Sequence, residues 1–191
     1  ELTLGTELTE EQRHYQVLVE QSAHSLLMLL NDILDYSKIE AGKLELENRE
    51  FDLRDSVGDI LHTLSPRAVE KNLELVFRVE PGVPVILSGD LTRLRQIIVN
   101  LVGNALKFTD RGEVVLSVEN RHDLDGQVEL LFKVRDTGIG VRADRLERIF
   151  EVFAQGDSST TREFGGSGLG LAISKRIVKK MGGEIWAESV V

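Results

Sequence analysis

Two short glycine-rich segments hold the residues of this chain that are best suited to chemistry. The first, Asp136-Thr-Gly-Ile-Gly140, follows an apolar run, and the second, Gly165-Gly-Ser-Gly-Leu-Gly-Leu171, opens a segment with helical apolar spacing. Glycine allows a backbone to approach a ligand closely, and a helix N-terminus presents free N–H groups to an anion. A carboxylate at a strand end together with such a helix start predicts a nucleotide site. Asp136 would contact the base and the second segment the phosphates.

A helix expected over 91–107 supplies a second group of polar side chains. At 3.6 residues per turn, one face of it carries five polar residues, namely Arg93, Gln96, Asn100, Asn104 and Lys107. Asparagine is a mediocre helix former, and glutamate or lysine more often fills an idle surface. A neutral amide oxygen suits a Mg²⁺ ion that is already bound to phosphates, because this ion keeps several waters and needs few protein ligands. This face therefore indicates a metal–phosphate site.

Each of these features has a simpler interpretation when it is taken alone. The polar helix face could be solvated surface, and Asp136-Thr-Gly138 could be an ordinary turn. Asp-Thr-Gly is also the catalytic triplet of aspartic proteases, and a homodimer could supply the second carboxylate. The protease interpretation leaves the asparagines and the second glycine segment unexplained. The order and spacing of all the features together favour nucleotide binding.

Composition limits the class of protein. The chain has 191 residues, of which 41% are hydrophobic, enough for one ordinary domain and a small appendage. Its net charge of −9 argues against sequence-independent binding of nucleic acid. The absence of cysteine excludes disulfides and thiolate metal sites. No apolar run has membrane-spanning length and no signal peptide is recognisable, so we expect a cytoplasmic location, with any membrane anchor lying in a longer parent protein.

The N-terminal region, 1–48, has the pattern of one long helix over 9–47. Thr9 and Gln12 fit a capping box at its start. A coiled-coil-like apolar stripe runs along Val19, Ala23, Leu26, Leu30 and Ile33. The stretch 26–30 is apolar on all sides and needs neighbours on several faces. We therefore expect a helical bundle, formed by a dimer with four helices; the alternative is a helix buried within its own domain.

The second region, 49–191, mixes helical and strand patterns. Helices are expected over 54–70, with a break near Pro66 or Asn72, over 91–107 after a cap at Asp90 or Thr92, over 142–150 and over 168–181. Strands are expected near 51–53, 73–79, 85–87, 113–119, 128–134 and 184–191, and a polar loop over 153–164. Helices on one face of a mixed, mainly antiparallel sheet would make an α+β fold, a two-layer α/β sandwich.

Four segments resemble sequence boxes of sensor histidine kinases. They match the asparagine, first glycine, phenylalanine and second glycine boxes, and they are Asn100-Leu-Val-Gly-Asn-Ala-Leu-Lys-Phe-Thr109, 136–140, Ile149-Phe-Glu-Val-Phe-Ala-Gln155 and Thr161-Arg-Glu-Phe-Gly-Gly-Ser-Gly-Leu-Gly-Leu171. The segment 31–42 is similar to the end of the second dimerisation helix, especially in hybrid kinases. The resemblance covers nearly the whole chain. It implies the GHKL (Bergerat) ATP-binding fold over 49–191, preceded over 1–48 by part of the dimerisation and histidine phosphotransfer hairpin.

The resemblance implies ATP and Mg²⁺ as cofactors and gives the matched residues roles. Asp136 would accept a hydrogen bond from the adenine amino group, and Gly138 and Gly140 would shape that pocket. Asn104 would bind the magnesium ion, with Asn100 beside it as a further metal-site residue.

The remaining matched residues would serve the phosphates and the lid. Lys107 and Arg162 would contact phosphate oxygens, and Phe108 would flank the nucleotide. Phe150 and Phe153 would anchor the base of the lid. The second glycine box would let the backbone approach the triphosphate through Gly166, Gly168, Gly170 and Leu171.

The resemblance implies transfer of the γ-phosphoryl group of ATP to a histidine and relay to a receiver-domain aspartate of a response regulator. It also implies a homodimer through the N-terminal helix. The family's His-Glu-x-x-Thr-Pro-like acceptor box does not occur here, and Glu1–Thr6 looks like the tail of the helix that carries it. We therefore expect the acceptor upstream of residue 1 and no autophosphorylation. His14 and His24 lack an adjacent carboxylate, and they, like His62 and His122, are expected to be ordinary histidines.

Two other functions stay open. The chain could be another ATPase of the same superfamily, of the gyrase, heat-shock chaperone or mismatch-repair type. It could also be a dimerisation module whose nucleotide site is degenerate.

Overall fold

The structure of the protein, a computed structural model, describes residues 6, 8–124, 126–146, 148–152 and 168–190. The chain divides into two compact units, Glu1–Leu44 and Glu45–Val191, and each is considered by itself. The functional domains expected over 1–48 and 49–191 stay predictions, because compactness alone assigns no role to either unit.

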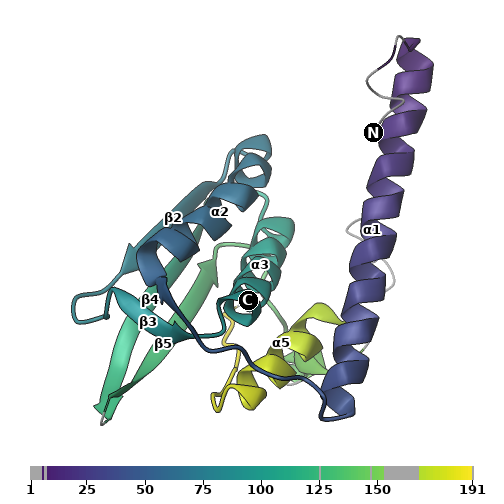
Figure 1. Ribbon diagram of the computed structural model, residues 1–191. Coiled ribbons are helices and arrows are strands. Elements are labelled where there is room, and N and C mark those ends of the chain that lie inside the picture. The colour runs from purple at the N-terminus through teal and green to yellow at the C-terminus, as the bar shows by residue number, and fades with distance from the viewer. Residues whose placement is uncertain (1–5, 7, 125, 147, 153–167, 191) are drawn as a thin grey trace. The chain divides into compact units, whose positions relative to one another are not determined.

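The first unit consists mainly of helix α1 (Glu10–Glu40), drawn in purple in Figure 1. Its predicted capping box is present: the Gln12 N–H donates to Thr9 Oγ1 at 3.2 Å, and the Thr9 N–H donates to Gln12 Oε1 at 3.0 Å. The helix was expected to reach residue 47 but ends at Glu40. Gly42 adopts a φ of 69°, a left-handed conformation that closes a helix and that glycine takes at little cost.

The apolar stripe predicted on α1 lies on the surface of this single chain. The side chains of Val19, Leu26, Leu30 and Ile33 are 48–62% exposed. Four large aliphatic residues in such a stripe represent several kcal/mol of unrealised burial, at about 1.5–3 kcal/mol each. The helical bundle that would cover them stays a prediction.

The second unit contains a three-stranded sheet and a separate strand pair. The strands β2 (Glu74–Val79), β4 (Glu113–Leu124) and β5 (Gln127–Asp136) lie in the order β2-β4-β5. β2 is parallel to β4, and β5 is antiparallel to β4 with a bulge between Asn120 and His122. The short strands β1 (Arg49–Asp52) and β3 (Ile86–Gly89) pair antiparallel with each other.

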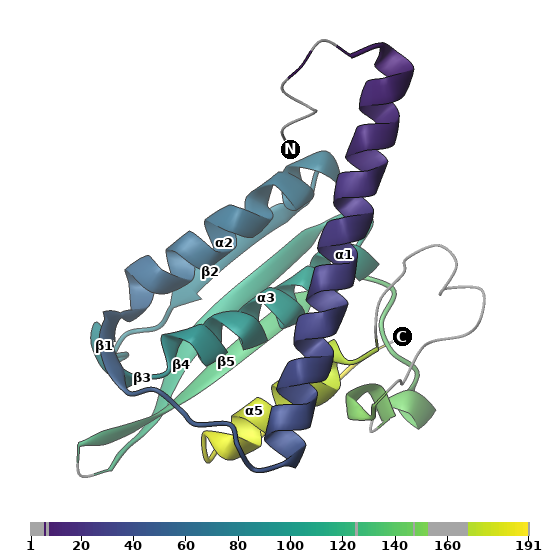
Figure 2. The ribbon, with the colours of Figure 1, turned by 45° about the vertical axis from the view of Figure 1, so that its right-hand side comes forward.

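The helices of this unit lie on one side of the sheet. Figures 1 and 2 show α2 (Leu53–Glu70) and α3 (Leu91–Phe108) along one face, with α5 (Gly170–Lys180) beside α3. Alternate residues of β4, namely Val114, Leu116 and Val118, are fully buried against them, as a period of two requires. This packing confirms the predicted α+β two-layer sandwich. It fixes the apolar side of α3 on the sheet and leaves its asparagine side for other contacts.

Of the two breaks expected after the first of these helices, the structure has the one at Asn72: α2 continues through Pro66 to Glu70, and Asn72 has a φ of 54°. Two other local predictions need correction. The helix expected over 142–150 is instead two 3₁₀ turns, η2 (Ala143–Arg145) and η3 (Arg148–Phe150). Isolated helices this short are marginal, and their few apolar residues provide little packing to extend them.

The second correction concerns the C-terminal segment. The strand expected over 184–191 is not formed over 184–190, the part that the structure describes. A strand needs a ladder of backbone hydrogen bonds, whereas the Val141 N–H near this segment donates to the Ser189 side chain at 2.8 Å. The polar loop expected over 153–164 lies outside the described residues. None of the described helices is long and apolar enough to cross a membrane.

Candidate nucleotide site

Helix α3, which carries the asparagines, is anchored at its first turn by one buried carboxylate. Asp90, 5% exposed, accepts a hydrogen bond from the Arg93 N–H at its Oδ1 (2.9 Å). Its Oδ2 accepts from the Glu47 N–H at 3.0 Å. Of the two caps considered, Asp90 and Thr92, the structure uses Asp90. The cap fixes where the helix begins and so which residues share its polar face.

The other end of α3 is held by a lysine from the end of α2. The Lys71 ammonium donates to the main-chain oxygens of Lys107 (2.8 Å) and Thr109 (3.0 Å). These are among the carbonyls that a helix end leaves without intrahelical partners. The Lys107 ammonium lies 4.8 Å from the centroid of the Phe108 ring, and burial lowers the pKa of Lys107 below the usual 10.5. This end of α3 thus presents a partly desolvated cation.

The two asparagines of α3 are joined to helix α5. The Asn100 Nδ2 donates to the Ser174 Oγ at 2.8 Å. The Asn104 Nδ2 donates to the Asn100 Oδ1 at 3.4 Å. Toward the start of the helix, Arg93 donates to the Gln96 side chain at 2.7 Å. The predicted polar face therefore contains two hydrogen-bonded groups, the Arg93–Gln96 pair and the Asn104–Asn100–Ser174 chain.

Asp136 lies at the end of β5, where its exposed carboxylate has one oxygen engaged. The Gly138 N–H donates to Asp136 Oδ1 at 2.9 Å. A Cβ at Gly138 would overlap the Phe108 carbonyl oxygen and lie 2.9 Å from Thr109 Oγ1, so only glycine fits here. Gly140 has a φ of 70°. The structure thus brings the first glycine box against the end of the asparagine helix, as the nucleotide-site prediction requires.

Thr109 is a residue of this region that the sequence reasoning did not single out. It is 0% exposed, and its hydroxyl oxygen has no hydrogen-bond partner among the residues that the structure describes. A buried hydroxyl without a partner costs about 1–3 kcal/mol. The one sequence signal was its position, directly after the expected helix end and within the asparagine box. Thr109 thus gives this region a buried hydroxyl that a water or a ligand could satisfy, close to the exposed carboxylate of Asp136.

The second glycine box begins α5 close to α3. A Cβ at Gly170 would overlap the Asn100 amide oxygen, so the absence of a side chain allows the two helices to approach. Gly168 adopts a φ of 67°, and Leu171 follows as a half-buried residue. Phe150 of η3 lies under the Lys175 ammonium, 5.6 Å from its ring centroid.

Three predicted site residues lie outside the described residues, namely Phe153, Arg162 and Gly166.

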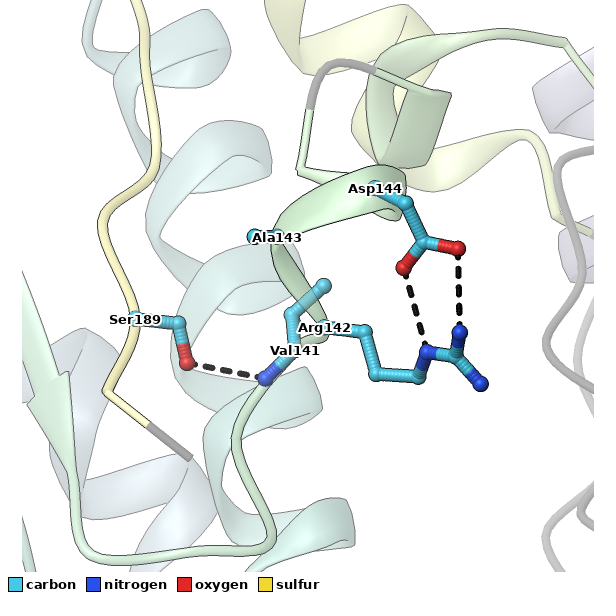
Figure 3. A pocket seen from close by; sticks show the side chains of 5 residues that line it. All are labelled: Val141, Arg142, Ala143, Asp144 and Ser189. Atoms are coloured by element: carbon cyan, nitrogen blue, oxygen red, sulfur yellow. Dashed lines mark hydrogen bonds and ion pairs between the residues drawn. The ribbon is translucent and has the colours of Figure 1, made fainter.

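A shallow hollow next to this region has a different character. Figure 3 shows its lining residues, Val141 to Asp144 together with Ser189. The Arg142 guanidinium donates two hydrogen bonds to the Asp144 carboxylate, at 3.1 and 3.2 Å, so each charge already has a partner. The hollow begins directly after Gly140 but contains none of the predicted ligand residues.

Comparison with known proteins decides the family. Residues 89–191, more than half of the chain, match the family described as histidine kinase-, DNA gyrase B-, and HSP90-like ATPases. The chain belongs to this ATPase family. The match begins just before α3 and includes both asparagines and both glycine boxes.

Curated relatives of this ATPase domain are signalling kinases. The chain is 48% identical over 184 residues to "Sensor protein GacS" of Pseudomonas syringae pv. syringae, covering 96% of the chain and 20% of that protein. It is 44% identical over 190 residues to "Hybrid signal transduction histidine kinase L" of Dictyostelium discoideum, covering 99% of the chain and 11% of that protein. The chain thus spans between about a tenth and a fifth of the length of these relatives. They confirm the resemblance to sensor histidine kinases.

Solved structures agree with the fold. Full-length ShkA in complex with AMPPNP matches with a TM-score of 0.77 and 37% identity, covering 97% of this chain and 38% of that one. The nucleotide-free catalytic domain of the histidine kinase ThkA matches with a TM-score of 0.61 and 25% identity, covering 74% of this chain and 86% of that one. The sandwich predicted from the sequence is therefore the histidine kinase ATPase fold.

Proposed function

We propose that this chain is the ATP-binding catalytic core of a two-component sensor histidine kinase of the hybrid type. In the whole protein it would transfer the γ-phosphoryl group of ATP to a histidine for relay to a receiver-domain aspartate. The observation that best supports this proposal is how much of the chain aligns with the kinase relatives. The kinase relatives align over 96–99% of the chain, including residues before position 89, where the general ATPase match begins. A gyrase-type or chaperone-type ATPase would be expected to share only the later part.

Adenine recognition would rest on the free oxygen of Asp136. Because Oδ1 is occupied by the Gly138 N–H, Oδ2 is the oxygen left to accept a hydrogen bond from the adenine amino group. Guanine carries an oxygen at the corresponding ring position and would place an acceptor against an acceptor. The site should therefore discriminate between ATP and GTP.

The triphosphate would lie between α3 and the start of α5. Lys107 would supply a cation there, and the Asn104 amide oxygen would supply a neutral ligand to Mg²⁺, with Asn100 beside it. Among the described residues, no three His, Cys, Asp or Glu side chains form a metal cluster, so the other ligands would be phosphate oxygens and water. When bound, the ion would neutralise charge on the phosphates during transfer.

The binding proposal is tested by Asp136→Asn. Because Oδ1 must still accept from Gly138, the amide nitrogen would occupy the Oδ2 position, where it cannot accept from adenine. Loss of a hydrogen bond to a charged group of about 1.5–3 kcal/mol corresponds to roughly 10–150-fold weaker binding. The measurement is titration with a fluorescent ATP analogue, with ATP and GTP as competitors.

The matched control is Asp59→Asn, an exposed aspartate on α2 that loses the same charge. It should bind the analogue as the unsubstituted chain does. Unchanged binding by Asp136→Asn would support the alternative of a dimerisation module with a degenerate site.

The kinase proposal includes three partners: ATP, a second copy through α1, and a receiver domain. Incubation of this chain alone with γ-labelled ATP should leave no acid-labile label. Stable label on His14 or His24 would contradict this expectation. His122 lies 3.8 Å from the Glu129 carboxylate across β4 and β5, as an ordinary surface pair does. Sustained ATP hydrolysis by the chain would favour an ATPase of another branch of the family.

A further inference from the structure

Asn100 is half-buried, and both ends of its side-chain amide have partners. Its Nδ2 donates to the Ser174 Oγ at 2.8 Å, and its Oδ1 accepts from the Asn104 Nδ2 at 3.4 Å. Ser174 is 1% exposed and lies one turn after Gly170, so both residues of α5 face the same asparagine.

The contact with Gly170 sets the orientation of this amide. A carboxamide can turn end for end and exchange its oxygen with its amino group. The hydrogen that Gly170 carries in place of a Cβ points at the Asn100 Oδ1. An oxygen there accepts a weak C–H hydrogen bond, whereas an amino group would place hydrogen against hydrogen. Gly170 thus selects the oxygen, and Ser174 accepts from the amino group.

This orientation determines how Asn104 is presented. The Asn100 oxygen can only accept a hydrogen bond, so its partner must be a donor. Asn104 therefore directs its Nδ2 toward Asn100 and its Oδ1 away from it. Among the described residues, nothing donates to the Asn104 Oδ1. A hard cation takes the oxygen of an amide and not its nitrogen.

We propose that Ser174 is a positioning residue for magnesium binding. Through Asn100, it holds Asn104 with its oxygen toward the phosphate-bound ion. Asn100 then acts on the metal through Asn104 and not as a direct ligand. The inference rests on the proposed function, because it concerns the ion that accompanies ATP.

The test is Ser174→Ala, with nucleotide affinity measured in Mg²⁺ and again in EDTA. Removing a residue that hydrogen-bonds to a metal ligand typically weakens metal binding on the order of 10–100-fold. The factor by which Mg²⁺ strengthens nucleotide binding should fall by about tenfold, while the affinity in EDTA stays within about twofold. The control is Ser65→Ala on α2, whose hydroxyl donates to the His62 carbonyl of its own helix. It should leave both affinities unchanged.

Two results would overturn the inference. One is an unchanged Mg²⁺ effect in Ser174→Ala, and the other is an equal loss of affinity with and without Mg²⁺, which would indicate a structural role only. Failure of the unsubstituted chain to bind nucleotide at all would instead remove the proposed function, and this inference with it. NMR of the unsubstituted, nucleotide-free chain gives an independent measurement. The Asn100 side-chain NH₂ should exchange with solvent more slowly than that of an exposed asparagine, and equally rapid exchange would contradict its hydrogen bond to Ser174.

Discussion

Replacing Gly170 by alanine should destabilise the second unit through one identifiable overlap. The three atoms nearest to the added Cβ all belong to Asn100: its Oδ1, which the Cβ would overlap, its Cγ at 2.9 Å and its Nδ2 at 3.2 Å. Gly170 has no positive φ, so its backbone conformation itself accepts alanine. The whole penalty should therefore come from contact with one side chain.

The magnitude follows from two opposing effects. Overpacking of a well-packed site costs about 1–3 kcal/mol. Alanine is the better helix former by up to about 1 kcal/mol, but Gly170 is the first residue of α5, where that advantage is smaller. We expect Gly170→Ala to lower the free energy of unfolding by about 1–2 kcal/mol.

A double-mutant cycle isolates the contact. In an Asn100→Ala background all three close atoms are gone, so adding Gly170→Ala should cost almost nothing. The coupling energy between the two positions should then be about 1–2 kcal/mol, within the range for residues in contact. Urea unfolding followed by the fluorescence of Trp186, the single tryptophan, and by circular dichroism gives all four stabilities.

The control is Gly58→Ala in α2, where an added Cβ meets nothing within 4 Å. It should stabilise the unit by about 0.5–1 kcal/mol. If Gly170→Ala were neutral, or equally costly with and without Asn100, the reasoning about this helix contact would be refuted.

Three further predictions concern the end of α3. Because burial lowers the pKa of Lys107 below the usual 10.5, its ammonium loses its proton at a lower pH than that of a free lysine, and nucleotide affinity should fall as the pH rises through that lowered pKa. The Lys107→Arg variant, measured by the same titration, should lose this pH dependence. Thr109→Val removes a buried hydroxyl that has no partner among the described residues, so denaturation should show a free energy of unfolding raised by up to about 1–2 kcal/mol; a marked loss of stability would contradict the absence of a partner. Lys71→Met removes two hydrogen bonds to the last carbonyls of α3 and should lower the free energy of unfolding by about 1–2 kcal/mol, whereas an unchanged stability would show that the cap is dispensable.

The sequence predicted most elements because their signals are local. The capping box at Thr9, the period of two in β4 and the aspartate cap of α3 each depend on neighbouring residues. The signals failed where the outcome depends on distant partners. Nothing within 184–190 determines whether another strand lies beside it, and the apolar alternation alone favoured a strand. Likewise, the residue pattern over 142–150 favoured a helix, but it could not show that too few apolar contacts are available to stabilise one.

The same distinction applies to the site. The types and spacing of Asn100, Asn104 and Asp136 indicated a nucleotide site without any structure. The role proposed for Ser174 could not be inferred, because nothing in the sequence around this serine indicates that its side chain contacts Asn100 of another helix. Thr109 was inside a recognised motif, but only its burial and unpaired hydroxyl distinguish it from an ordinary helix-ending threonine.

The two bonds of the Asp90 carboxylate have a mechanical consequence. One oxygen fastens the connecting segment at Glu47, and the other fastens the first turn of α3. Tension that lifts the segment would release the first oxygen and free the carboxylate to rotate, so the second bond would loosen as well. A displacement of the segment at Glu47 would thus affect the first turn of α3, the helix that carries both asparagines.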